Sequence, residues 1–178
     1  MKYKLKIRTG QLLAVMLILA WVAFVGFMIE AGAVLVSYGV SCVNAEAAKN
    51  LYKGLDLYGL RQFNLWYYTG SVCFLVVLSL LKALVSWLVI TTLSRFNLQN
   101  PFTMGVAKRL ETISYISFGI WLVTLLSNVY TGWLLKITGK LHGNWLSGEF
   151  IYMVGLVFVI SQVFKRGVEI QSENDLTV

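Results

Sequence analysis

Residues 12–40 read LLAVMLILAWVAFVGFMIEAGAVLVSYGV, a run that is apolar except for Glu30 and a few small polar residues. A helix needs roughly 20 mainly apolar residues to cross the hydrocarbon core of a bilayer. This run is long enough to cross, and it is longer than the roughly 7–15-residue core of a cleavable signal peptide. It therefore predicts a first membrane helix that stays in the chain as a signal anchor.

Three further apolar runs follow, and they predict helices at about 65–94, 112–135 and 146–165. The chain of 178 residues is 58% hydrophobic and only 13% charged, whereas soluble domains are about 25% charged. Long continuous runs also differ from the alternating pattern of a membrane barrel. We expect an all-α integral membrane protein, with a four-transmembrane-helix bundle at residues 1–166 and an acidic cytoplasmic tail at 167–178.

Basic residues beside the runs predict the orientation, because cytoplasmic loops carry an excess of Lys and Arg. Nine lie at the N-terminus, in the second loop and after the last run: Lys2, Lys4, Lys6, Arg8, Arg95, Lys108, Arg109, Lys165 and Arg166. Five lie in the first and third loops: Lys49, Lys53, Arg61, Lys136 and Lys140. Both termini are therefore expected in the cytoplasm. The net charge of +7 follows this topological pattern, so we expect no direct binding of nucleic acid.

Two connecting segments carry helical signals. In the polar connection 41–63, Leu51, Tyr52, Leu55 and Tyr58 share one helical face, which fits either an interfacial helix on the outer surface or a short helical loop. In the second loop, Asn100 suits a helix N-cap and Pro101 the first helical position. We expect a cytoplasmic extension of the third helix there, which enters the membrane near Ile113. Trp66, Tyr67 and Tyr68 are expected as interfacial anchors of the second helix.

Glu30 and Lys82 are the ionisable residues that lie deep in the apolar runs. A charge at the bilayer centre costs about 2.5–3.5 kcal/mol on insertion scales, so each residue is a candidate for a functional role. Three alternatives remain open. The two side chains pair and lock the first helix to the second, each reaches a nearer interface, or one of them binds an ion or a substrate.

No catalytic or cofactor motif is evident in the sequence. Cys42 and Cys73 have neither metal-site nor redox-pair spacing, and a disulfide between them depends on their geometry. His142 stands apart from any carboxylate or cysteine cluster, so no metal site is expected. We therefore expect a protein that is not an enzyme and that uses no cofactor.

The C-terminal segment, residues 167–178, combines acids with spaced aliphatic residues. Its end is the candidate partner-binding site: Glu173, Asn174, Asp175, Leu176, Thr177 and Val178. One alternative is docking on a partner, with Leu176 and Val178 filling pockets. The other is a solvated, disordered end.

The chain resembles the small bacterial membrane proteins grouped as domain-of-unknown-function family 2975. The likeness covers the four-run layout and two motifs. The first is Asn100-Pro101-Phe102-Thr103 followed by Arg109-Leu110; the second is Phe164-Lys165-Arg166-Gly167 followed by the ending Glu173 to Val178. The resemblance implies a multi-pass protein of the inner (plasma) membrane without established chemistry. It also implies a small helix-turn-helix regulator as partner, because genes for such regulators commonly neighbour those of this family.

Three hypotheses follow. The first is a membrane regulator or anchor that binds a small cytoplasmic DNA-binding regulator through the tail and the loop residues Asn100, Pro101, Phe102 and Arg109. The alternative is a small proton-coupled transporter, similar in outline to the small multidrug exporters, in which Glu30 exchanges protons and Trp21, Phe24 and Phe27 line a site. The third, a disulfide-forming membrane oxidoreductase, ranks last because such enzymes need closely spaced cysteine pairs.

Overall fold

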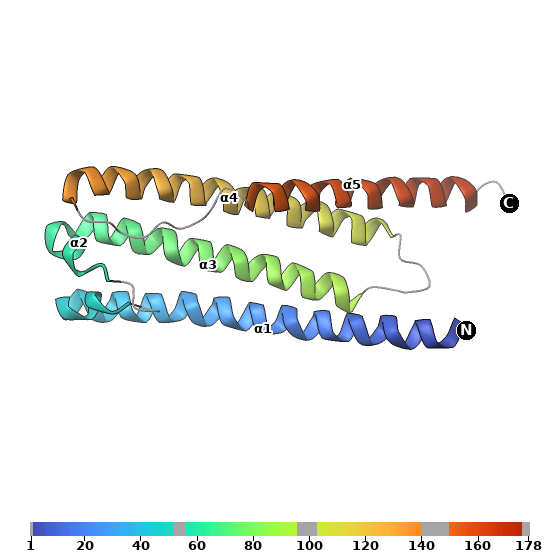
Figure 1. Ribbon diagram of the computed structural model, residues 1–178, viewed down its shortest axis with the longest axis horizontal. Helices are drawn as coiled ribbons and strands as arrows, with labels where there is room; N and C mark the ends of the chain where they lie inside the picture. Colours follow the sequence, from blue (N-terminus) through green and yellow to red (C-terminus); the bar gives the residue numbers. More distant parts are fainter. Residues whose placement is uncertain (1, 52–55, 96–102, 140–149, 176–178) are drawn as a thin grey trace. The chain divides into compact units, whose positions relative to one another are not determined.

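The computed structural model describes residues 2–51, 56–95, 103–139 and 150–175, and these form a succession of helices (Figure 1). Side-chain surroundings are described from residue 10 onward, excluding 150–154 and 172–175. In chain order the elements are α1 (Lys2–Val43), the 3-10 helix η1 (Ala45–Lys49), α2 (Tyr58–Phe63), α3 (Leu65–Ser94), α4 (Met104–Thr138) and α5 (Phe150–Asp175). The all-helical prediction is therefore confirmed.

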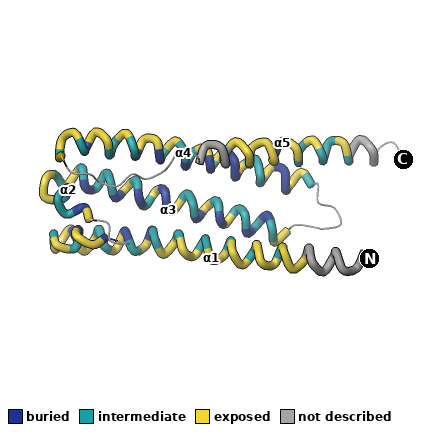
Figure 2. The backbone as a smooth tube through the Cα atoms, viewed as in Figure 1, coloured by how far each residue is buried: buried dark blue, intermediate teal, exposed yellow. Residues whose placement is uncertain are grey.

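Three of these helices are long and apolar enough to cross a membrane: the Gly10–Val43 part of α1, α3 and α4. The structure has α3 at the predicted bounds, whereas α1 extends beyond the predicted 12–40 at both ends. In the most apolar 18-residue stretch of α1 only 6% of the residues are buried, against 33% in the corresponding stretches of α3 and α4. Figure 2 shows the same contrast, with exposed residues along most of α1. α1 thus offers most of its surface to the surroundings, as a helix in lipid can.

Helix α4 begins beyond the predicted Asn100-Pro101 start, and those two residues lie outside the described part of the chain. Thr103 occupies the capping position, since its hydroxyl accepts a hydrogen bond from the Val106 N–H at 3.4 Å. At the other end, Gly139 has a positive φ of 65° and its N–H bonds to the Leu135 carbonyl at 2.9 Å. Glycine is the residue that adopts this left-handed conformation without steric cost, so it terminates the helix.

The helices group into two compact units, each described here by itself. Unit 1 comprises residues 1–24, 84–118 and 149–178, and unit 2 comprises 25–83 and 119–148. Unit 1 contains the first half of α1, the end of α3, the start of α4 and α5. Unit 2 contains the remaining parts of α1, α3 and α4, with η1 and α2. The count of Lys and Arg residues along the sequence compares the same two groups of segments.

The hydrophobic core of unit 2 joins parts of α1, η1, α2, α3 and α4. Its buried members are Val34, Ala48, Leu51, Leu57, Leu60, Tyr68, Val72, Leu75 and Leu134. The connection between α1 and α3 contributes three leucines that are at most 1% exposed, and the Leu57 N–H bonds to the Ala48 carbonyl at 2.9 Å. This connection therefore contains two short helices, as the alternative of a short helical loop predicted, and its leucines pack inward as a cap on the core. Tyr52 and Leu55 lie outside the described residues.

Hydroxyl groups join α1 to α3 within unit 2. The Tyr38 and Thr69 hydroxyls lie 3.0 Å apart, and those of Ser41 and Tyr68 lie 2.7 Å apart. Ser41 donates its hydrogen to the Tyr38 carbonyl, so Tyr68 is the donor to Ser41. Tyr68 is fully buried, while Trp66 is 82% exposed. Of the predicted aromatic anchors, Trp66 has the expected exposure, whereas Tyr68 is a core residue.

A tyrosine on α4 joins that helix to α3. The Tyr130 hydroxyl donates to the Tyr67 carbonyl at 3.1 Å. It also lies over Gly70, where an added Cβ would be 2.7 Å from the Tyr130 oxygen. Gly70 therefore allows this close approach, as small residues commonly do between membrane helices, and a Cβ there would shift the Tyr130 hydroxyl.

Gly70→Ala should destabilise the protein by about 1–3 kcal/mol, the usual cost of overpacking, because the methyl group would displace the Tyr130 hydroxyl. The measurement is thermal unfolding of the purified chain in detergent. Gly132→Ala is the matched control, since a Cβ there meets nothing within 4 Å, and it should leave the midpoint unchanged or raise it. Equal midpoints for the two variants would contradict the packing described.

Candidate functional site

The first candidate site surrounds Glu30 on α1, within unit 2. Glu30 is half-buried and precedes Ala31 on the face that also carries Val34, both 3% exposed. Three contacts join α1 to α3 in unit 2: Phe27 with Lys82, Tyr38 with Thr69, and Ser41 with Tyr68. As the residue number rises along α1 it falls along α3, and the two numbers of each pair add to 107–109. The two helices are therefore antiparallel in a fixed register. The position opposite Glu30 on α3 therefore lies between residues 77 and 79. Lys82 is offset by roughly one helical turn, about 5 Å.

Lys82 and Glu30 have different surroundings. The Lys82 ammonium lies 5.8 Å from the centroid of the Phe27 ring, within the range of a cation–π interaction. The Glu30 carboxylate has no hydrogen bond or ion pair with any residue that the structure describes. The register thus brings the two residues near one another, as their depths in the sequence suggested, without joining them in an ion pair. A carboxyl group without a fixed partner, inside an apolar helix, can take up a proton or a cation.

Two buried polar atoms of unit 2 have no partner among the described residues, namely Asn128 Oδ1 on α4 and Arg61 Nε on α2. The guanidinium of Arg61 is otherwise held, because its Nη2 donates to the Cys42 carbonyl at 3.3 Å. A cation at this place complements the negative end of α1. Sequence reasoning counted Arg61 as a loop charge and passed over Asn128, an amide within an apolar run. Cys42 and Cys73 are both free and exposed, so no disulfide joins them.

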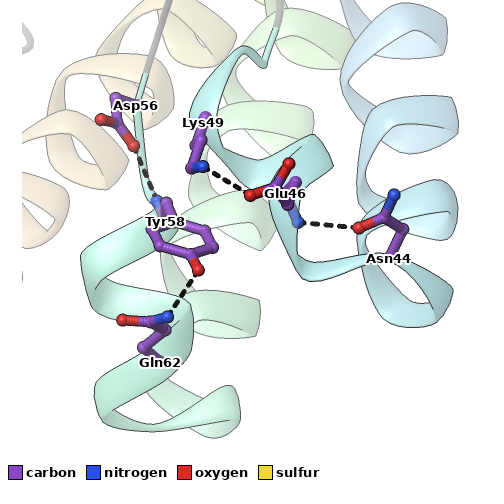
Figure 3. A network of polar contacts seen from close by, with 6 residues as sticks. All are labelled: Asn44, Glu46, Lys49, Asp56, Tyr58 and Gln62. Atoms are coloured by element: carbon purple, nitrogen blue, oxygen red, sulfur yellow. Dashed lines mark hydrogen bonds and ion pairs between the residues drawn. The ribbon is translucent and has the colours of Figure 1, made fainter.

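A polar network orders the cap of unit 2, and Figure 3 shows it from close by. The Asn44 side chain accepts a hydrogen bond from the Glu46 N–H at 3.0 Å and so caps η1. Lys49 bonds to the Glu46 carboxylate at 2.7 Å and lies 4.8 Å from the centroid of the Tyr58 ring. Lys49 therefore connects η1 to α2.

Tyr58 is held from two further sides (Figure 3). The Asp56 carboxylate accepts from its N–H at 2.9 Å, and Gln62 donates to its hydroxyl at 2.6 Å. The network is exposed, and its atoms are engaged with one another. It orders the cap and does not form a reactive centre.

The predicted cytoplasmic loop site is only partly described. Asn100, Pro101 and Phe102 lie outside the described residues. Arg109, in unit 1, donates from Nη1 to the Thr91 carbonyl at 2.5 Å. This bond places a guanidinium at the last turn of α3, a position that the sequence alone did not indicate.

The predicted tail is helical as far as it is described, because α5 continues to Asp175. Arg166 and Glu169 form an ion pair at 2.7 Å, and Ile170 is 47% exposed. The side chains of Glu173, Asn174 and Asp175 are not described, and Leu176, Thr177, Val178 and His142 lie outside the described residues. As far as Asp175 the segment continues a longer helix, which supplies the length that an isolated segment of this size lacks.

Within the described ranges, no group of three or more His, Cys, Asp or Glu residues could hold a metal ion. The folded chain is thus defined by long apolar helices, three of which can span a membrane.

Residues 45–178 match the family model described as protein of unknown function (DUF2975). The chain belongs to this family, as its sequence motifs indicated. No similar protein was found among curated sequences, and no similar fold among solved structures.

The Lys49–Glu46 pair predicts a local pH response of the cap. The hydrogen bond from Lys49, and secondly its charge, hold the pKa of the Glu46 carboxyl below its usual 4.5. A carboxyl with a lowered pKa stabilises the fold above its unfolded pKa, and this contribution is lost as the pH falls through the lowered value. Amide chemical shifts of residues 46–49 should therefore titrate below pH 4.5.

Lys49→Met should return the Glu46 midpoint toward 4.5. Lys136→Met removes another exposed lysine of unit 2 that has no such pair, and it should leave the midpoint unchanged. The assignment is wrong if Lys49→Met also leaves the midpoint where it was.

Proposed function

We propose that this protein is a multi-pass protein of the inner (plasma) membrane that anchors and regulates a small helix-turn-helix transcription regulator through the C-terminal end of α5. The observation that carries the proposal is the continuation of α5 to Asp175, beyond the basic pair Lys165-Arg166 that ends its apolar run. Residues 167–175 extend the helix by about 13 Å. A helix that projects from a membrane is a ready platform for a partner.

The chemistry of this extension suits a basic partner. It carries Glu169, Glu173 and Asp175 without a basic residue, and the exposed Ile170 adds an apolar contact. Helices that combine apolar anchors with charge commonly dock in grooves of other proteins. DNA-binding proteins present basic surfaces. An acidic helix can therefore occupy the surface that would otherwise contact phosphates.

The proposal includes a fourth crossing by residues 146–165 and cytoplasmic termini. Both terminal segments belong to unit 1, together with Arg95, Lys108 and Arg109, in agreement with the excess of positive charge expected on the cytoplasmic side. Regulation then follows from linkage. If two states of the membrane domain differ in binding free energy for the partner by about 1–3 kcal/mol, the dissociation constant of the partner differs by about 5–150-fold.

The test is a pull-down of the full chain from native cells in detergent, with partners identified by mass. The full chain should retain a small DNA-binding protein, and a chain ending at Arg166 should lose it while remaining in the membrane. A chain ending at Asp175 separates the helix from the last three residues. The charge reversal Glu173→Lys with Asp175→Lys should abolish capture, because like charges then face the basic partner.

The matched control is Glu46→Lys, which reverses a charge in the cap of unit 2 and should leave the captured proteins unchanged. Equal partner sets for the full chain and the chain ending at Arg166 would refute the docking role of α5.

A second candidate function is proton-coupled transport through Glu30. The observation that favours it is a half-buried carboxylate in a spanning helix without a hydrogen bond or ion pair among the described residues. Carboxyl groups in such positions serve as proton carriers in transporters. Phe27 belongs to the same surroundings, since its ring faces Lys82.

Glu30→Gln should abolish proton-coupled flux of a cationic dye in proteoliposomes, because the amide cannot exchange a proton. Glu30→Asp should retain part of it. The control is Glu111→Gln on α4, whose carboxylate accepts a long 3.5 Å hydrogen bond from Tyr115. Flux that is the same in the wild-type and Glu30→Gln proteins would exclude this function.

A further inference from the structure

A pocket in unit 1, at the junction of α3 and α4, is not used by either proposed function. It has a volume of about 200 Å³ and is lined by Thr92, Arg95, Thr103, Gly105, Val106 and Arg109. Two arginines and two threonines thus line one small space, and none of the lining residues is acidic. This composition favours an anion.

The two arginines are prepared for a ligand in different ways. One N–H of Arg109 is fixed on the Thr91 carbonyl, which orients the guanidinium and leaves its other donors for a ligand. Arg95 is exposed and has no hydrogen bond or ion pair with the described residues. One arginine is therefore held in place before binding, while the other is available to close on the ligand.

The start of α4 adds to the positive potential. The pocket includes the first turn of this helix, with Thr103, Gly105 and Val106, and the N-terminal end of a helix carries a partial positive charge. A Cβ placed on Gly105 would meet nothing within 4 Å, so a ligand oxygen can approach the backbone there. The acidic residue Glu111 follows the pocket residues on α4, and its carboxylate accepts a hydrogen bond from the Tyr115 hydroxyl.

We propose that this pocket binds the phosphate group of a phosphorylated ligand. Arginine pairs with phosphate through two parallel hydrogen bonds, which selects phosphate over halides. Pockets for drug-sized ligands measure about 300–1,000 Å³, so the smaller volume here suits a phosphate group and not an entire nucleotide. Arg95 directly follows α3, a helix long and apolar enough to cross a membrane, and lipid headgroups are expected beside the end of such a helix. The phosphate comes from an anionic lipid headgroup or from solution.

The experiment measures thermal unfolding of the full chain in detergent in two arms. In the first, short-chain phosphatidylglycerol is titrated against short-chain diacylglycerol, which lacks the phosphate. In the second, inorganic phosphate is titrated against chloride at equal ionic strength. The midpoint should rise with the phosphate-bearing probe in at least one arm. A rise in the first arm alone assigns the pocket to lipid, and a rise with inorganic phosphate assigns it to a soluble ligand.

Arg95→Gln tests the residue without removing a known contact, and it should raise the half-saturating probe concentration by about tenfold, the effect of one charge-assisted hydrogen bond. Lys108→Gln is the matched control, because Lys108 is an exposed cation of the same helix start that does not line the pocket. It should change the half-saturating concentration by less than about twofold, as expected for a screened surface charge.

Two outcomes would overturn the proposal. One is no rise in either arm. The other is an equal rise of the half-saturating probe concentration in Arg95→Gln and Lys108→Gln, which would mean that diffuse positive charge attracts the anion without a pocket. Neither outcome depends on the DNA-binding partner or on transport, so this test is separate from both proposed functions.

Discussion

A hydrocarbon layer offers no hydrogen-bond partners, so each backbone amide within it must bond inside its own segment. The long helices α1, α3 and α4 meet this constraint, and the remaining polar groups follow from it. Serine and threonine hydroxyls bond back to carbonyls of the preceding turn, as Thr124 does to Ile120 at 2.8 Å. The hydroxyls of Tyr38, Tyr68 and Tyr130 instead reach a neighbouring helix, and the Ser41 hydroxyl bonds both to its own helix and to Tyr68. In unit 2, hydroxyl groups that would be costly to bury without a hydrogen bond therefore join neighbouring helices and fix their register.

The sequence was sufficient to locate α1, α3 and α4 because lipid imposes one strong requirement, an uninterrupted apolar run. It predicted α3 at its observed bounds and the uninterrupted course of α4 from the polar segment at Lys108 into the membrane. It did not predict that Leu51, Leu57 and Leu60 face inward, because an apolar helical face looks the same whether it meets lipid or protein. The burial of Tyr68 beside the exposed Trp66 was hidden for the same reason.

The candidate sites show a similar division. The sequence indicated Glu30 and Lys82 as candidates because a charged side chain within an apolar run costs free energy. Their mutual placement depends on the register of α1 and α3, which no local pattern encodes. Arg95 appeared in the sequence only as a charge that sets orientation, and Arg109 as such a charge and as a loop residue of the partner-binding hypothesis. These two residues lie 14 positions apart, so the pocket that they line depends on how the end of α3 and the start of α4 are placed.

The inward-facing cap of unit 2 has a consequence for the order of assembly. Its leucines pack on residues from α1, α3 and α4, yet the cap is synthesised before α3 and well before α4. The nascent segment between the first two spanning helices therefore leaves the ribosome with its apolar residues uncovered. It cannot reach its final environment until Leu134 is in place. Packing of the cap is thus completed only after α4 has been made.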